Sequence, residues 1–156
     1  SKDALRMENK QAEYLDSLVD SAAKFYTPYA KNFVIMGMGN HETAILKRHG
    51  HNLTKALVRR LNEAGGQVFS GGYGGWVQMF FTMRRTVKTS LNLKYFHGSG
   101  GGGPVTRGVI QTNRQAVYLP DADIVLNGHV HEAYHVAIAR ERLSQGGKVN
   151  QDIVDY

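Results

Sequence analysis

The chain contains no cysteine among its 156 residues. This absence excludes disulfide bonds, thiolate metal ligands and cysteine nucleophiles, so any bound metal ion must be held by nitrogen and oxygen ligands. No apolar run approaches the length of a membrane span, and the opening residues SKDALRMENK lack the basic and then apolar pattern of a signal peptide. We therefore expect a cytoplasmic protein with no membrane partner.

The size and composition of the chain are those of an ordinary globular protein. Of its 156 residues, 42% are hydrophobic and 21% are charged, which is enough apolar material for one domain with its own core. No repeat, low-complexity linker or compositional break marks a domain boundary. We therefore predict a single domain over residues 1–156.

The net charge of the chain is positive. The value of +6 with neutral histidines suits an anionic partner such as phosphate or nucleic acid. We expect the charges to be spread along the chain. The residues that come nearest to forming a basic cluster are Arg84, Arg85 and Lys88. The charge alone therefore leaves open whether the partner is anionic or the protein is simply basic.

The hydrophobic pattern predicts helices and strands in mixed order. Apolar residues at three- and four-residue steps favour helices, which we expect at 3–27, 53–64 and 105–119. Short apolar or alternating runs favour strands, which we expect at 33–36, 68–69, 76–83, 91–97, 123–126 and 136–139. Residues 85–90 are expected to form a hairpin turn, and the tail after Gln145 is polar and weakly patterned. The fold class is therefore mixed α/β, and ligands are expected beyond the carboxyl ends of parallel strands.

Two histidines follow an expected strand in Gly128-His129-Val130-His131. Imidazole is a good ligand for manganese, iron or zinc, and Gly128 lets the backbone approach a metal ion closely. The alternative is a pair of surface loop histidines.

A second polar motif, Gly39-Asn40-His41-Glu42, also follows an expected strand. The Asn40 side-chain oxygen can bind a cation without adding negative charge, and His41 can donate a proton to a leaving oxygen or stabilise charge on a phosphate. The alternative is that Asn40 caps a helix that begins at Glu42, with His41 exposed. His97 ends another expected strand, where it is either a metal ligand or a surface histidine.

The order of these motifs resembles that of the calcineurin-like metallophosphoesterase family. The resemblance rests on Gly-Asn-His-Glu, a strand-ending histidine and Gly-His-x-His, and it covers roughly residues 33–135. It implies a two-sheet β-sandwich flanked by helices and a centre of two divalent ions of the manganese, iron or zinc type.

The resemblance also implies a role for each site residue. Asn40, His97 and His129 would ligate one metal ion, and His131 would ligate the other. His41 would be the catalytic histidine that acts on the phosphate or the leaving group. No serine or cysteine nucleophile is then needed, because the nucleophile is a metal-activated water.

The chain departs from the family pattern ahead of Gly39. The family's Asp-x-His and Gly-Asp motifs, which supply ligands to both metal ions, do not occur there, and a helical pattern starts almost directly after Ser1. We therefore expect this chain to be the C-terminal portion of a domain in a longer parent, with a fold that is incomplete at its N-terminus. For the isolated chain we expect at most one weakly bound ion and little or no activity.

The function predicted from the sequence is metal-dependent phosphoester hydrolysis. The substrate is either a phosphomonoester, including phosphoprotein, or a phosphodiester such as nucleic acid, and the oligomeric state is left open. Arg107 and Arg114 fall on one face of an expected helix, where they bind phosphate oxygens or form a solvated face. The alternative function is a non-catalytic nucleic-acid-binding or interaction module on the same fold.

Overall fold

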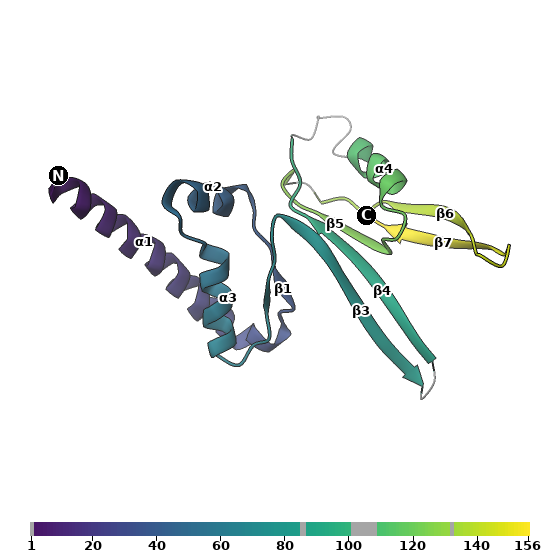
Figure 1. Ribbon diagram of the computed structural model, residues 1–156, viewed down its shortest axis with the longest axis horizontal. Helices are drawn as coiled ribbons and strands as arrows, with labels where there is room; N and C mark the ends of the chain where they lie inside the picture. The colour runs from purple at the N-terminus through teal and green to yellow at the C-terminus, as the bar shows by residue number, and fades with distance from the viewer. Residues whose placement is uncertain (1, 85–86, 101–108, 132) are drawn as a thin grey trace. The chain divides into compact units, whose positions relative to one another are not determined.

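The computed structural model describes residues 2–84, 87–100, 109–131 and 133–156 (Figure 1). The chain divides into two compact units, Ser1–Tyr73 and Gly74–Tyr156. Both helices and strands are present, so the predicted mixed α/β class is confirmed. Each unit has its own buried cluster, and a single domain over residues 1–156 stays a prediction.

The N-terminal unit consists of helices and one short parallel strand pair. Its elements, in chain order, are α1 (Lys2–Tyr26), the 3-10 helix η1 (Thr27–Asn32), β1 (Ile35–Met36), α2 (Asn40–His49), α3 (Leu53–Glu63) and β2 (Phe69–Ser70). β1 and β2 pair in parallel, with Ile35 opposite Phe69. The predicted helices at 3–27 and 53–64 are therefore confirmed, and Pro28 lies in the first turn of the 3-10 helix that follows α1.

The core of the N-terminal unit lies where α3 meets the chain after α1. Leu61 is fully buried, and Val58, Ala30 and Val68 complete the cluster around it. The Asn62 side chain holds the segment before β2 by two hydrogen bonds: it accepts one from the Val68 N–H at 2.7 Å and donates one to the Val68 carbonyl at 3.0 Å. These bonds fix the position of the strand that pairs with β1.

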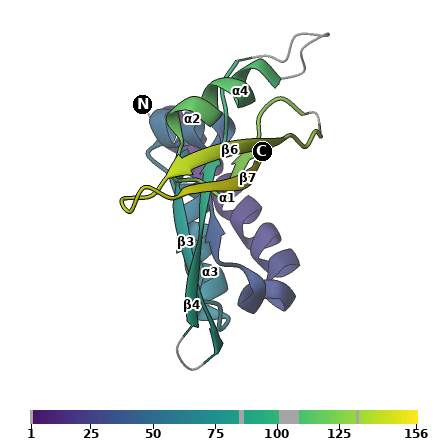
Figure 2. The same ribbon diagram turned by 90° about the vertical axis from the view of Figure 1, so that its right-hand side faces the viewer.

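The C-terminal unit is built on one five-stranded sheet with the order β3-β4-β5-β7-β6. Its elements are β3 (Gly74–Arg84), β4 (Val87–Phe96), α4 (Val109–Tyr118), β5 (Ile124–Asn127), β6 (Ala137–Leu143) and β7 (Val149–Asp155). β4 and β5 are parallel, whereas β3 with β4 and β6 with β7 are antiparallel hairpins. The β3–β4 hairpin reaches well beyond β5, which pairs only with residues 93–96 of β4 (Figures 1 and 2).

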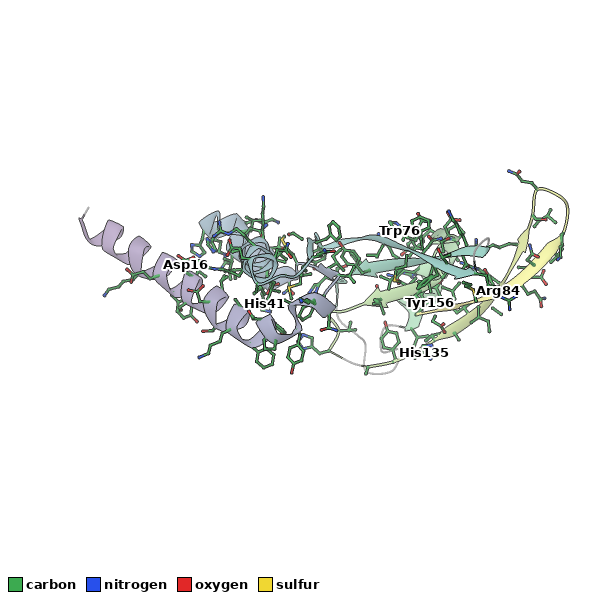
Figure 3. The ribbon with its side chains drawn as sticks, turned by 90° about the horizontal axis from the view of Figure 1, so that it is seen from below. Asp16, His41, Trp76, Arg84, His135 and Tyr156 are labelled. Carbon is green, nitrogen blue, oxygen red and sulfur yellow. The ribbon has the colours of Figure 1, made fainter. Side chains whose placement is uncertain are left out.

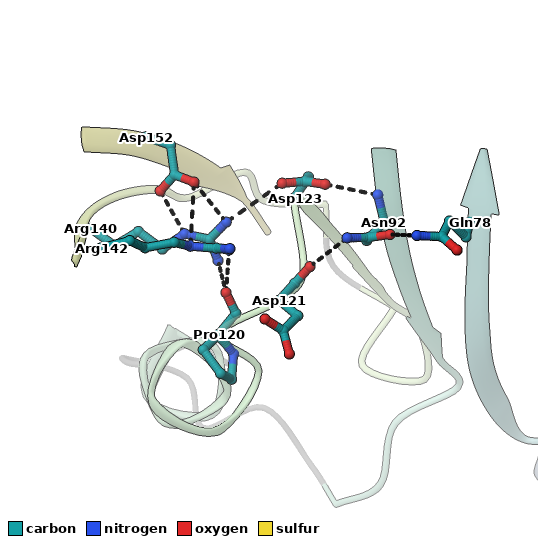
Figure 4. Close-up of polar contacts among 8 residues, drawn as sticks. All are labelled: Gln78, Asn92, Pro120, Asp121, Asp123, Arg140, Arg142 and Asp152. Carbon is teal, nitrogen blue, oxygen red and sulfur yellow. Dashed lines mark hydrogen bonds and ion pairs between the residues drawn. The ribbon is translucent and has the colours of Figure 1, made fainter. Parts of the chain in front are cut away.

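The contact between β5 and β7 is the shortest in this sheet, because it has one paired position, Ile124 with Asp155. A polar network spans this junction (Figure 4). Arg140 of β6 binds Asp152 of β7 through two hydrogen bonds of 2.6 and 3.0 Å and approaches Asp123, just before β5, at 3.5 Å. Asp123 in turn accepts a hydrogen bond of 2.8 Å from the Asn92 N–H of β4. The network therefore ties the β6–β7 hairpin to the rest of the sheet.

Two sequence predictions about the C-terminal unit are wrong. Residues 87–90 belong to β4 and not to a turn, because they continue the antiparallel ladder with β3. No element was expected in the weakly patterned tail, but residues 149–155 form β7, whose Val154 is buried and whose Ile153 is exposed. No helix within the described ranges is long and apolar enough to cross a membrane.

Candidate functional site

Two of the predicted ligands lie at the carboxyl ends of neighbouring parallel strands. The register of β4 and β5 pairs Phe96 with Asn127, so His97 and Gly128 leave the sheet side by side. The Gly128 N–H donates to the Phe96 carbonyl at 3.2 Å, which continues the ladder past the last paired residues. This parallel pairing delivers His97 and His129 to one edge of the sheet.

Two glycines allow the chain segments to approach this closely. Gly98 has a φ of +95°, and a Cβ atom added there would lie 2.8 Å from the Gly128 carbonyl oxygen. A Cβ atom at Gly128 would lie 3.2 Å from the His97 carbonyl oxygen. A side chain at Gly98 would therefore force the two strand ends apart. This role of Gly98 was not predicted from the sequence, although a glycine directly after a strand-ending histidine is a visible signal.

The rings of His97 and His129 meet in this narrow space. Nε2 of His97 lies 3.4 Å from Nδ1 of His129, and the ring planes are inclined at 70°. Both side chains are half-buried. The two ring nitrogens are therefore in direct contact, at a distance that two ligands of one ion can have.

The backbone at His129 and His131 is held in a left-handed conformation. Their φ values of +75° and +56° are the only positive ones among the non-glycine residues that the structure describes. The Val130 N–H donates to the Gly128 carbonyl at 3.0 Å, so His129 is the central residue of a tight γ-turn. Such conformations cost about 1–3 kcal/mol each and are concentrated at functional sites. His131 itself is exposed.

The end of β5 is fixed from a second direction by α4. The Asn127 amide donates to Gln115 at 2.7 Å, and the Gln115 amide donates to Asn127 at 3.1 Å. This reciprocal pair attaches α4 to the residue that precedes Gly128. Asn127 and Gln115 were not singled out from the sequence, because nothing in the pattern indicates that they meet.

Asn40 and His41 lie in the N-terminal unit, at the start of α2. The helix is capped by Gly39 rather than by Asn40: the Glu42 carboxylate accepts from the Gly39 N–H at 2.9 Å, and the Thr43 hydroxyl donates to the Gly39 carbonyl at 2.7 Å. The alternative in which Asn40 is the cap is therefore wrong. Both Asn40 and His41 are exposed, and Figure 3 labels His41. Their placement beside His97 and His129 stays a prediction.

Of the two arginines predicted to bind phosphate, Arg107 and Arg114, the structure describes only Arg114. Arg114 is an exposed residue of α4. Arg107 lies outside the described residues. A common arginine face on this helix therefore stays a prediction.

Within the described ranges, no group of three or more His, Cys, Asp and Glu side chains is placed to hold a metal ion. The structure thus brings together one pair from the predicted set, His97 and His129. Comparisons with known protein families, with curated proteins and with solved structures found no significant match to this chain.

Proposed function

We propose that this chain carries part of the site of a metal-dependent phosphoester hydrolase of the calcineurin-like type. The observation that carries the proposal is the approach of the His97 and His129 ring nitrogens, at 3.4 Å, across the ends of two parallel strands. The order of the motifs supports it independently, because Gly-Asn-His-Glu, His97 and Gly-His-x-His follow one another as in that family.

The chemistry of the donor pair fits one divalent ion. Two imidazole nitrogens bound to one tetrahedral zinc ion, each at about 2.0–2.1 Å, are about 3.4 Å apart. The His97–His129 separation has this value, which is also within hydrogen-bonding distance of the two rings. Imidazole also suits manganese and iron, so the pair does not select among these ions.

The proposal assigns each residue a role. Asn40 would complete the ligands of the ion at His97 and His129, and His131 would ligate a second ion whose other ligands come from carboxylates. Bound divalent ions would supply a water of lowered pKa and charge to neutralise the phosphate oxygens. His41 would hold the proton that the leaving oxygen receives, while Arg107 and Arg114 would orient the phosphate.

The finer fold, a two-sheet sandwich flanked by helices, belongs to the same proposal. Its support is that both sheets contain a parallel pair, β1 with β2 and β4 with β5. In each case a polar motif that resembles one of the family follows a paired strand: Gly-Asn-His-Glu follows β1, and Gly-His-x-His follows β5. The chain would then supply the C-terminal part of this fold.

Calorimetric titration with zinc or manganese tests the metal site. We expect at most one weakly bound ion, and we expect His97→Ala or His129→Ala to abolish its binding. His135→Ala is the matched control, because His135 belongs to the same unit but pairs with Asp155 at 2.9 Å. Loss of binding in the control alone, or two tight manganese sites, would contradict the proposal.

Hydrolysis assays test the reaction itself. Bis(4-nitrophenyl) phosphate is a phosphodiester and 4-nitrophenyl phosphate is a monoester, so the pair separates the two substrate classes. We expect little turnover by this chain alone, with any manganese-dependent turnover lost in His41→Ala. Binding of DNA that is unaffected by chelator and by His41→Ala, together with no metal binding, would favour the non-catalytic module instead.

A further inference from the structure

The positive charge of the chain is concentrated in one stretch. Residues 64–120 contain six Lys and Arg residues and no Asp or Glu, whereas basic and acidic residues are equal in number over the rest of the chain. The whole net charge of +6 therefore belongs to this stretch. The interpretation of the charge as spread along the chain is wrong.

Half of this charge lies on the two strands of the β3–β4 hairpin. Arg84 ends β3, and Lys88 and Lys94 belong to β4. Arg84 and Lys88 are exposed. The hairpin also reaches beyond β5 (Figures 1 and 2). Arg84 and Lys88 are therefore carried on a two-stranded arm with β3 as its outer edge, and Lys94 lies at the base of this arm, where β4 pairs with β5.

The two faces of the arm differ in composition. On one face, which we call the aromatic face, the cross-strand pairs are Trp76 with Lys94, Gln78 with Asn92, Phe80 with Ser90 and Thr82 with Lys88. All four of its β3 residues are exposed. The opposite face carries the half-buried apolar pairs Val77 with Leu93 and Met79 with Leu91, and also Phe81, which stands opposite Thr89 and is 46% exposed.

The aromatic face offers large rings to solvent. Phe80 is 77% exposed and Trp76 is 49% exposed, which is unusual for rings of this size in a sheet. Nζ of Lys94 lies 5.4 Å from the centroid of the Trp76 ring, within the range of a cation–π contact. Gln78 and Asn92 are joined by a hydrogen bond of 3.0 Å between their side chains, which holds polar groups between the two rings.

We propose that the aromatic face of the β3–β4 arm binds a single strand of nucleic acid. Bases stack on Trp76 and Phe80, because aromatic side chains accept any base with an open ring face. Phosphates bind Lys88 and Lys94, and the absence of acidic residues on the arm removes the charge that would repel them. A single strand is favoured over a duplex because the bases of a duplex are already stacked on one another.

The dimensions of the arm agree with this partner. Trp76 and Phe80 are four residues apart on one strand, which separates them by about 13 Å along the sheet. Lys88 stands opposite Thr82 near the far end of the arm, and Lys94 stands opposite Trp76 near its base. Lys94 therefore lies beside Trp76 at one end of the aromatic face, and Lys88 lies beyond Phe80 at the other end.

The strand that carries Lys88 and Lys94, β4, also leads to the histidine site. β4 ends at Phe96, and His97 follows at once, so Lys94 lies about 10 Å along the strand from His97. If the site hydrolyses phosphoesters, a strand bound to the arm is its substrate and the substrate class is a nucleic acid phosphodiester. This last step rests on the proposed function, whereas binding to the arm does not.

The single tryptophan of the chain, Trp76, makes the test direct. The intact chain is titrated in EDTA with an oligothymidylate of about 20 nucleotides, and tryptophan fluorescence is recorded with the anisotropy of a labelled strand. We expect quenching of the fluorescence with the same affinity as the anisotropy change, and weaker binding as salt rises. A duplex of the same length is expected to bind more weakly and to quench less.

Three variants locate the surface. Phe80→Ala should weaken binding of the single strand by roughly 5- to 150-fold, and it removes few buried contacts because Phe80 is exposed. Lys88→Glu should weaken binding and lower the salt slope by about 0.7 or more. Lys148→Glu makes the same charge change in the exposed connection between β6 and β7 and should leave binding nearly unchanged. Circular dichroism verifies that each variant is folded.

Several outcomes would overturn the inference. One is Trp76 fluorescence that is not quenched when the single strand binds, and another is an equal loss of affinity in Lys88→Glu and Lys148→Glu. Unchanged affinity in folded Phe80→Ala, or tighter binding of the duplex than of the single strand, would also overturn it. Because the titration is done in EDTA, it is independent of the metal site. Oligonucleotide binding without metal binding at His97 refutes the proposed function alone, and metal binding without oligonucleotide binding refutes this inference alone.

Discussion

His97 and His129 face each other across the ends of β4 and β5, with Nε2 of His97 3.4 Å from Nδ1 of His129. The pair depends on the parallel register that sets Phe96 opposite Asn127 and on glycine at 98 and 128. A divalent ion bound between the two imidazoles should stabilise this unit, because the ion binds the folded site and not the unfolded chain.

The first prediction concerns addition and removal of metal. Zinc at one hundred times its dissociation constant should stabilise the protein by about 2.7 kcal/mol, because it binds the folded site only. EDTA should reverse the gain completely. Thermal unfolding followed by circular dichroism measures both. His97→Ala should show no gain with zinc, and His135→Ala, which alters a histidine outside the pair, should retain it.

The second prediction concerns the close approach at Gly98. Gly98→Ala should lower the free energy of unfolding by about 2–4 kcal/mol, because alanine is strained at a φ of +95° and its Cβ would lie 2.8 Å from the Gly128 carbonyl oxygen. Gly147→Ala separates the two causes, since Gly147 has a φ of +77° but nothing within 4 Å. Its cost should be about 1 kcal/mol. Urea unfolding measures both costs. Equal losses of stability in Gly98→Ala and Gly147→Ala would show that the close approach of Gly98 to the Gly128 carbonyl is unimportant.

The third prediction concerns the left-handed backbone at His131. His131→Gly should raise the free energy of unfolding by about 0.5–1 kcal/mol, because glycine adopts the φ of +56° without strain. His131→Ala is the control: it also removes the imidazole but keeps the Cβ atom, so it should give no gain. A gain from glycine alone would mean that histidine is kept at this position at the expense of stability. Equal effects of both substitutions would exclude backbone strain.

The sequence predicts most of the elements because their hydrophobic patterns are local. Leu57, Val58 and Leu61 recur at helical spacing, and α3 forms over them. Val125 and Leu126 continue a short apolar run, and β5 forms there. The strand ends also follow from such runs, which is why the position of His97 and His129 after neighbouring strands could be expected.

What the sequence does not predict depends on partners that are distant in the chain. β7 is polar except at Val149, Ile153 and Val154, and it becomes a strand because β6 supplies a full antiparallel ladder. The close approach of Gly98 to Gly128 appears only once β4 and β5 pair in register. The division after Tyr73 has no compositional mark, because the apolar content is similar on both sides of it.

The fourth prediction concerns the polar network around Arg140. Its side chain is only 16% exposed and donates to Asp152, to Pro120 and toward Asp123, so it joins β6 and β7 to the start of β5. Arg140→Ala should lower the free energy of unfolding by about 1–3 kcal/mol, because it leaves charged and polar partners without their donor. Urea unfolding measures the loss. Arg140→Lys should be intermediate, since lysine cannot form the two-pronged contact with Asp152.

The fifth prediction concerns the acid dependence of the same network. The hydrogen bonds from Arg140 hold the pKa of the Asp152 carboxyl below its ordinary value of 3.8, helped by the charges of Arg140 and Arg142. A carboxyl whose pKa is lowered by folding stabilises the protein fully above its unfolded value and loses this contribution as pH falls through its folded value. The stability of the wild-type protein should therefore fall as pH drops below about 4.

Asp152→Asn should remove part of this slope. Asparagine has nearly the shape of aspartate but does not titrate, so the variant is less stable at neutral pH and its stability changes less in acid. Urea unfolding at a series of acidic and neutral pH values measures the two slopes. Asp121→Asn is the matched control, because the Asp121 side chain is exposed and the network uses only its backbone carbonyl, which accepts from Asn92. If Asp121→Asn flattens the acid slope as much as Asp152→Asn, the slope reflects general charge and not the Arg140–Asp152 pair.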